Sequence, residues 1–161
     1  MAASKSSCRF RTDRAGFPAL ALTADTAVLT AWANDVGFDD VFARQVEAIG
    51  NPGDVLMGIS TSGRSRNLLS AFRAARRLGL RTLAVLGHGG GDLKRLADHV
   101  LIVPSDDTQR IQEVQRVALH LLCELVDARL MEEAREEREA DAAATAARRH
   151  RTRSVPDELA A

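Results

Sequence analysis

The sequence predicts an α/β domain in which a parallel sheet of about four strands is flanked by helices in a three-layer arrangement, followed by a long C-terminal helix. Three observations predict this fold class. Short runs rich in Val, Ile and Leu are each followed by a turn signal, helical patterns separate these runs, and the runs are almost entirely apolar, as in a sheet covered on both faces. Alternating strands and helices favour parallel strands that are joined by right-handed crossovers.

The individual elements follow from local patterns. Four apolar runs are predicted to form strands: residues 19–22, 55–59, 82–86 and 100–103. Apolar residues at helical spacing predict helices over residues 39–49 and 67–78. Asn51-Pro52-Gly53 separates the first of these helices from the second strand, and the glycine-rich segment 87–91 forms the turn after the third strand.

The C-terminal third of the chain has a different composition. From residue 108 to residue 130, apolar residues recur every three or four positions, which predicts a long amphipathic helix. Residues 131–161 are rich in Glu, Arg and Ala and are expected to continue as a solvated helix that then frays. The predicted organisation is an irregular stretch at 1–8, one domain at 9–130 and a charged tail at 131–161.

Composition excludes several classes of partner. The 161 residues are 45% hydrophobic and 27% charged, enough apolar material for a single core. Lys+Arg and Asp+Glu both count 22, so no overall basic field would attract nucleic acid or an anionic membrane. Cys8 and Cys123 lie too far apart in sequence and context to suggest a disulfide framework or a metal motif. The sequence shows no signal peptide and no apolar run near ~20 residues, so we expect a cytoplasmic protein.

The segment GISTSGRS at residues 58–65 is the strongest candidate for a binding site. It lies between a predicted strand and a predicted helix and carries four hydroxyl groups, on Ser60, Thr61, Ser62 and Ser65. The free N–H groups and the dipole of a helix N-terminus favour an anion there, and hydroxyl groups add donors. We therefore predict a site for the phosphate of a small ligand. The alternative is that Ser65 only caps the helix and the other hydroxyls only satisfy the turn.

Two other motifs nearly match the same segment. It differs from a Walker A loop by Arg64, which stands where that loop has lysine, and Asp106 could then serve as the acidic partner after a later strand. A nucleotide-binding site of this type is therefore a further alternative. The hydrolase elbow G-x-S-x-G does not fit, because Ser62 occupies the position of its second glycine.

Several separated motifs resemble the sugar isomerase (SIS) domain of phosphoheptose isomerases. They are LTADT at 22–26, AND at 33–35 followed by Gly37-Phe38, the segment at 58–65 and RIQE at 110–113, and the resemblance runs from about residue 9 to residue 127. It implies a flavodoxin-like SIS fold. It also implies a cytoplasmic enzyme that converts sedoheptulose 7-phosphate to D-glycero-D-manno-heptose 7-phosphate, acts as a homotetramer with shared active sites, and often holds zinc.

The resemblance also implies roles for single residues. The sugar phosphate would be held by the four hydroxyl residues Ser60, Thr61, Ser62 and Ser65. Asp25 would bind substrate hydroxyls, and Arg9 matches an arginine near the family's site. Gln112 and His120 match residues that serve in metal binding and proton transfer.

The spacing of Gln112 and His120 leaves their roles open. Without the resemblance, a lone histidine on a largely apolar helix is more typical of a packed side chain than of a ligand. Eight residues on a regular helix separate the pair by ~12 Å along the axis and ~80° around it, so a single ion between them would need a distorted turn or a neighbouring subunit. His88 and His99 match no site of the family and are read as structural or solvent-facing.

The sequence departs from the family before Arg9. Relatives carry there a strand ending in Gly-Asn-Gly-Gly-Ser and a helix with the glutamate base and a metal-binding histidine, whereas this sequence has MAASKSSC. Gln115 also stands where relatives often have histidine. We expect an N-terminally truncated relative that lacks the first strand and helices of the family. It is then either an isomerase acting through an enediol or a non-catalytic sugar phosphate-binding or regulatory module.

Overall fold

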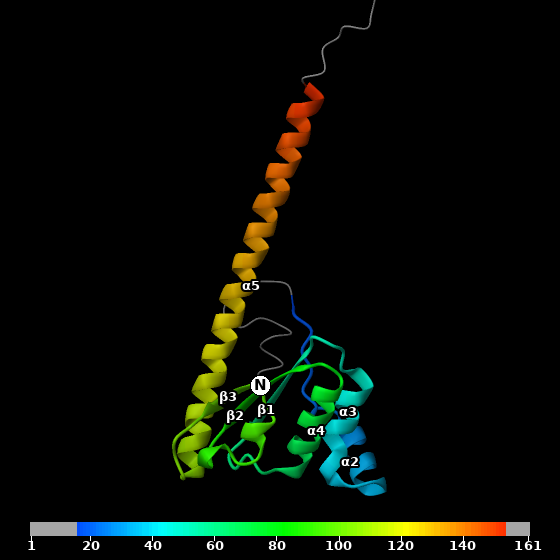
Figure 1. The fold of residues 1–161 in the computed structure, drawn as a ribbon, viewed down its shortest axis with the longest axis vertical. Coiled ribbons are helices and arrows are strands. Elements are labelled where there is room, and N and C mark those ends of the chain that lie inside the picture. Colours follow the sequence, from blue (N-terminus) through cyan, green and yellow to red (C-terminus); the bar gives the residue numbers. More distant parts are fainter. Residues whose placement is uncertain (1–15, 154–161) are drawn as a thin grey trace, which may run out of the picture.

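The computed structural model describes residues 16–153 (Figure 1). Its elements, in chain order, are α2 (Thr26–Asp35), η1 (Phe38–Asp40), α3 (Val41–Ile49), β1 (Val55–Ser60), α4 (Arg66–Arg77), β2 (Arg81–Leu86), η2 (His88–Gly90), η3 (Leu93–Arg95), β3 (His99–Ile102) and α5 (Thr108–Arg153). The described strands form one parallel sheet in the order β1-β2-β3. The predicted parallel α/β fold class is therefore confirmed.

The layers are visible in Figure 1. Helix α4 covers one face of the sheet, α3 packs against α4, and α2 lies outside α3, whereas α5 runs along the other face and continues well past the sheet. Strands β1 and β2 are joined through α4, as the alternating pattern predicted. Within residues 16–153, no helix combines the length and the apolar content that crossing a lipid bilayer requires.

Small side chains let α3 and α4 pack closely. Their shared apolar cluster consists of Ala43, Val46, Ala71, Ala74, Ala75 and Leu80. A second cluster joins α4 to the sheet and contains Leu69, Phe72, Ala84, Leu86 and Leu93. The fully buried Phe72 ring packs directly on Gly58 of β1, where a Cβ atom would lie 2.6 Å from the ring. Because α4 is fixed against β1 in this way, its N-terminus is fixed at the carboxyl end of that strand.

The predicted strand at residues 19–22 is wrong. Among the described residues the sheet has three strands, and residues 19–22 form no part of it. The chain instead turns, with the Ala24 N–H donating to the Ala21 carbonyl (2.9 Å), and Leu22 packs against the cluster between α3 and α4. Gln45 of α3 holds this segment by donating to the Leu22 carbonyl (3.0 Å). A short apolar run here covers a helix pair rather than extending the sheet.

Helix α2 has no counterpart among the predicted elements. None of its residues is buried, so its apolar spacing is a weak signal. The usable signal was its N-cap, because Asp25 Oδ1 accepts a hydrogen bond from the Val28 N–H (3.0 Å). On its inner side, Trp32 lies under the guanidinium group of Arg44, 5.1 Å from the ring centroid, which links α2 to α3.

Helix α5 continues without interruption across the predicted domain boundary at residue 130. It extends to Arg153, so the charged stretch after residue 130 is helical as far as that residue. Ion pairs between residues three or four apart support the exposed part, for example between Arg129 and Glu132 (3.0 Å). The predicted fraying at the end of the tail falls on residues 154–161, outside the described residues.

A compact hydrogen-bonded group closes the amino edge of the sheet. The Asp98 carboxylate accepts from both the N–H and the hydroxyl of Thr82, each at 2.8 Å, and the Thr82 hydroxyl accepts from the Asp98 N–H (2.9 Å). The Thr82 side chain is fully buried. The hydrogen bonds from Thr82 hold the pKa of the Asp98 carboxyl below its ordinary value of 3.8.

This group predicts how stability depends on pH. Because the pKa of Asp98 is lower in the folded state, its contribution is fully present above the unfolded value of 3.8 and is lost as the pH falls through the folded value. Asp98→Asn is expected to lower the midpoint of thermal unfolding by about 5 °C at pH 7 and by less at pH 3. Thermal unfolding monitored by circular dichroism at both pH values tests this. An equal loss at both would contradict it, and Asp92→Asn, at an exposed loop carboxylate, is the control.

Candidate functional site

The loops that follow the three strands meet at the carboxyl edge of the sheet. Ser60, Leu86 and Ile102 lie in register at the ends of β1, β2 and β3. The Gly87 N–H donates to the Ser60 carbonyl (3.2 Å), and the Leu93 N–H donates to the Gly63 carbonyl (2.9 Å). The loop after β1 is therefore bonded to the loop after β2 at two points. In open α/β sheets this edge is where ligands bind.

Two of the predicted hydroxyl groups shape the loop. Ser60 is buried, and its Oγ accepts the Gly63 N–H (3.0 Å). Ser62 Oγ accepts the Arg64 N–H (3.2 Å). In both cases the hydroxyl acts as acceptor, so its own O–H can still donate to a ligand. The loop is thus ordered by the same hydroxyl groups that were predicted to bind phosphate, and Thr61 between them is half-buried.

Ser65 lies at the N-cap of α4, as predicted, but its hydroxyl does not cap the helix. Its backbone is extended (φ −63°, ψ 119°), and within the described residues its side chain makes no capping hydrogen bond. The part of the alternative in which the Ser65 side chain caps the helix is therefore wrong, whereas the hydroxyls of Ser60 and Ser62 do accept hydrogen bonds within the turn. Its hydroxyl stands beside the first N–H groups of α4, which have no partner within the helix. This is the arrangement expected of an anion site at a helix N-terminus.

The loop requires glycine at its centre. Gly63 has φ +63°, in the left-handed region, and a Cβ atom there would collide with the Gly90 carbonyl. From the other side, a Cβ atom on Gly91 would lie 2.5 Å from the Ser62 carbonyl oxygen. The two loops therefore touch backbone to backbone, which leaves little freedom for the position of the hydroxyl groups.

The two residues predicted on α5 lie on the same helix but in different surroundings. Gln112 is exposed and His120 is half-buried. Among the described residues, no three side chains of His, Cys, Asp or Glu lie close enough together to hold a metal ion. Gln112 and His120 offer one amide oxygen and one imidazole nitrogen, ~12 Å apart along a regular helix. The described residues of one chain therefore do not fit a zinc ion by themselves.

Sequence reasoning missed the part played by Gln115. Its side chain is 4% exposed, and its Nε2 donates to the carbonyls of Ser60 (3.2 Å) and Val85 (3.0 Å). A signal was present, because Gln115 stands between Ile111 and Leu119 at i, i+4 and i+8 on the buried face of the helix. A polar side chain inside an apolar stripe needs partners for its hydrogen bonds.

The remaining candidates lie on other segments or outside the described residues. Asp25 caps α2, at an exposed position, and Arg9 lies outside the described residues. Among the residues that the structure describes, His88 is the one non-glycine residue with a positive φ (+43°). Its Nδ1 lies 3.4 Å from Asp106 Oδ1. Asp106 is almost fully exposed and is the fourth residue after the end of β3, an unfavourable position for the acidic partner of a Walker A loop. His99 is exposed and begins β3, at the opposite edge of the sheet.

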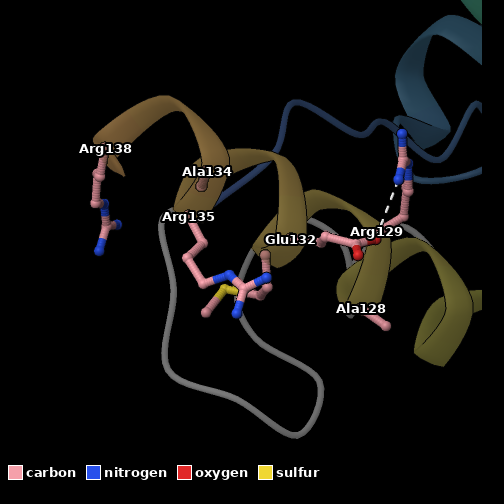
Figure 2. Close-up of a pocket in the computed structure, with 7 residues that line it drawn as sticks. Ala128, Arg129, Glu132, Ala134, Arg135 and Arg138 are labelled. Atoms are coloured by element: carbon pink, nitrogen blue, oxygen red, sulfur yellow. Dashed lines mark hydrogen bonds and ion pairs between the residues drawn. The ribbon is translucent and has the colours of Figure 1, made fainter. Parts of the chain in front are cut away.

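A hollow of about 730 Å³ lies along α5, away from this edge (Figure 2). Its lining contains three arginines, but Arg129 is paired with Glu132 and Glu133, and Arg135 with Glu139, on the same helix. The hydrogen bond from Arg129 to Glu132 and the charge of Glu133 raise the pKa of Arg129, and the glutamates neutralise the positive charge locally. The charge balance is unlike that of a phosphate site, so the loop at residues 58–65 remains the candidate.

The fold and this loop define a parallel α/β domain with a hydroxyl-rich loop, the candidate anion site, at the carboxyl edge of its sheet. The SIS domain family matches residues 2–87. The phosphoheptose isomerase of Helicobacter pylori strain P12 is 53% identical over 119 residues, which is 74% of this chain and 62% of that protein. That of Campylobacter jejuni strain 81116 is 50% identical over 125 residues, 78% of this chain and 67% of that protein. The chain belongs to the SIS domain family and, within it, to the phosphoheptose isomerase family.

Solved structures agree with this assignment. A phosphoheptose isomerase from Francisella tularensis superposes with a TM-score of 0.76 at 42% identity, over 79% of this chain and 68% of that one. A phosphoheptose isomerase from Neisseria gonorrhoeae gives 0.71 at 40% identity, over 79% and 67%. The chain spans 62% of the length of the Helicobacter pylori relative. The predicted resemblance and the SIS-type fold are confirmed.

Proposed function

We propose that this chain is a phosphoheptose isomerase-like protein that converts sedoheptulose 7-phosphate to D-glycero-D-manno-heptose 7-phosphate. The observation that carries the proposal is the loop at residues 58–65, with Ser65 at the N-terminus of α4 and its hydroxyl not used for capping. Such a loop suits a phosphate dianion. Identity of about half to phosphoheptose isomerases supports a sugar phosphate as the ligand.

Each group has a proposed role. The hydroxyls of Ser60, Thr61, Ser62 and Ser65 hold the phosphate. Asp25 binds substrate hydroxyls, and Arg9 lies near the substrate. In an aldose–ketose isomerisation a base removes the proton from the carbon beside the carbonyl, and the enediol that forms is protonated on the neighbouring carbon. His120, whose imidazole can accept and return a proton, is proposed to move a proton between the reacting oxygens, and Gln112 is proposed to hydrogen-bond to them. The location is proposed to be cytoplasmic.

Zinc is expected from the resemblance to phosphoheptose isomerases, but no step of this proposal depends on it. Gln112 and His120 would be its ligands in this chain, and one amide oxygen with one imidazole nitrogen falls short of the four ligands that zinc usually takes. Where zinc is bound, it would polarise the sugar carbonyl and stabilise the enediolate. The remaining ligands would have to come from outside the described residues of this chain.

Turnover of sedoheptulose 7-phosphate by the full chain, with and without added zinc, tests the proposal. Conversion to the aldose, followed by NMR of the sugar anomeric protons, would support it. Calorimetric titration with the same sugar phosphate measures binding separately. If neither conversion nor saturable binding occurs, the proposal is wrong.

A second candidate is a non-catalytic module that binds a sugar phosphate and acts in regulation. The observation that favours it is that, among the described residues, no three side chains of His, Cys, Asp or Glu are grouped so that they could hold a metal ion. Asp106, the carboxylate nearest in sequence to the end of β3, is paired with His88. Saturable binding without conversion would select this candidate over the isomerase.

The proposed isomerase is expected to assemble from several copies, as a tetramer by analogy with its family. Support comes from an apolar stripe on α5 at Val114, Val117, Leu121 and Leu125, whose residues are 46%, 58%, 53% and 69% exposed. These positions lie on one side of the helix. Exposed apolar surface of this kind is typical of a protein interface.

The stripe gives a testable prediction. Replacing the two leucines of the stripe, Leu121→Glu and Leu125→Glu, is expected to convert the assembled protein to monomer, because two carboxylates would be buried in the interface without partners. Light scattering coupled to gel filtration measures the mass. Arg116→Glu, at an exposed position of the same helix, is the control and should leave the mass unchanged. A wild-type chain that is already monomeric at micromolar concentration would contradict the prediction.

A further inference from the structure

Gln115 of α5 is hydrogen-bonded to the end of β1, where the loop at residues 58–65, the proposed phosphate loop, begins. Its Nε2 carries two N–H groups, and each is used: one donates to the carbonyl of Ser60 and the other to the carbonyl of Val85. The side chain is 4% exposed, so water cannot replace these bonds. The amide therefore joins α5 to two neighbouring strands, β1 and β2, near their carboxyl ends.

The hydrogen bonds continue from Ser60 into the loop. Its carbonyl also accepts the Gly87 N–H (3.2 Å), and its Oγ accepts the Gly63 N–H (3.0 Å). The Ser60 carbonyl is thus bonded both to α5 and to the loop after β2, and the Ser60 hydroxyl is bonded within the loop at residues 58–65. A change in the position of α5 at Gln115 is transmitted through Ser60 to the loop that would hold the phosphate.

The packing around Gln115 makes this connection stiff. One turn earlier on α5, the buried Ile111 packs on Gly87, where a Cβ atom would lie 2.5 Å from the Ile111 side chain. Helix α5 therefore rests directly on the start of the loop after β2. On the same helix, Gln112 precedes Gln115 by three residues and His120 follows it by five. The anchor at Gln115 sets the position of both relative to the loop.

We propose that Gln115 is a positioning residue for ligand binding: its amide fixes α5 to the Ser60 carbonyl and so sets the geometry of the phosphate loop. The inference rests on the proposed function, since it concerns the binding of the same sugar phosphate. Gln115 does not touch the ligand in this proposal. It acts through Ser60.

Gln115→Met tests the proposal, because methionine has a similar volume and no N–H group. The expected result is a rise of about tenfold in the Kd for sedoheptulose 7-phosphate, measured by calorimetry on the full chain. Gln115→His, whose imidazole can restore one donor, should give an intermediate Kd. The control is Thr82→Val, which removes buried hydrogen bonds at the opposite edge of the sheet. It should lower thermal stability and leave the Kd unchanged.

A second measurement does not depend on the ligand. Amide hydrogen exchange at Gly63, whose N–H bonds to Ser60 Oγ, should be faster in Gln115→Met than in Thr82→Val at matched stability. Unchanged exchange at Gly63, or a Kd equal to that of the wild type, would overturn the role of Gln115 while the proposed function stands. If the wild-type chain fails to bind the sugar phosphate, the proposed function is wrong, and exchange at Gly63 alone then decides whether Gln115 positions the loop. Should Gln115→Met fail to fold, Gln115→His carries both measurements.

Discussion

Replacing both Ser62 and Ser65 by alanine is expected to raise the Kd for sedoheptulose 7-phosphate by at least about tenfold. Hydrogen bonds to a charged group contribute roughly 1.5–3 kcal/mol each, and 1.4 kcal/mol corresponds to a factor of ten. The Ser65 hydroxyl makes no capping bond, so its removal should act on the ligand and little on the helix. Calorimetric titration of the wild type and the double variant measures the difference.

The single variants separate binding from loop order. Ser62 Oγ accepts the Arg64 N–H, so Ser62→Ala removes a bond within the loop as well as a donor to the ligand. Ser65→Ala removes the donor alone and should leave thermal stability close to that of the wild type. Ser70→Ala, about one turn further along α4, is the matched control and should leave the Kd unchanged. If the double variant binds the sugar phosphate as tightly as the wild type, the phosphate assignment is wrong.

The strands of the sheet were predictable because each is marked by a local run of apolar residues. Apolar runs at residues 55–59 and 82–86 lie within β1 and β2, and the helical spacing at 67–78 matches α4 to within one residue at each end. The expected burial on both faces holds for β2, most of whose residues are buried. It does not hold for β1 and β3, where Ile59 and Leu101 are each 42% exposed. The run at residues 19–22 has the same local character. It fails as a strand because pairing depends on a neighbour, which a local pattern does not contain.

The site was predictable in composition but not in its internal bonding. The density of hydroxyl groups in the loop after β1 pointed to an anion site. Whether the Ser65 hydroxyl was free or used as a cap depends on side-chain geometry that the sequence does not encode locally. The role of Gln115 depends on carbonyls that lie 55 and 30 residues away in the chain. Such contacts arise when the fold brings distant segments together, so propensity and spacing do not predict them.

The contacts between the loops after β1 and β2 explain why substitution of Gly63 should impair stability and ligand binding more than substitution of a serine in the loop. A serine-to-alanine change removes one donor, whereas a side chain at Gly63 would push the loops after β1 and β2 apart. A Cβ atom there collides with the Gly90 carbonyl, and the Leu93 N–H bond to the Gly63 carbonyl holds the same two segments together. The contact is between backbone atoms, so no side-chain rotation can relieve it.

Gly63→Ala is therefore expected to lower the midpoint of thermal unfolding by about 5–10 °C and to raise the Kd for sedoheptulose 7-phosphate by about a hundredfold or more. Gly89→Ala is the matched control. Gly89 has a similar backbone angle (φ +72°, against +63° for Gly63), but a Cβ atom there meets nothing within 4 Å. Both variants share the conformational penalty of a left-handed alanine, so the difference between them isolates the collision with Gly90. Equal losses of affinity in the two variants would show that backbone conformation alone, and not the contact between the loops, determines binding.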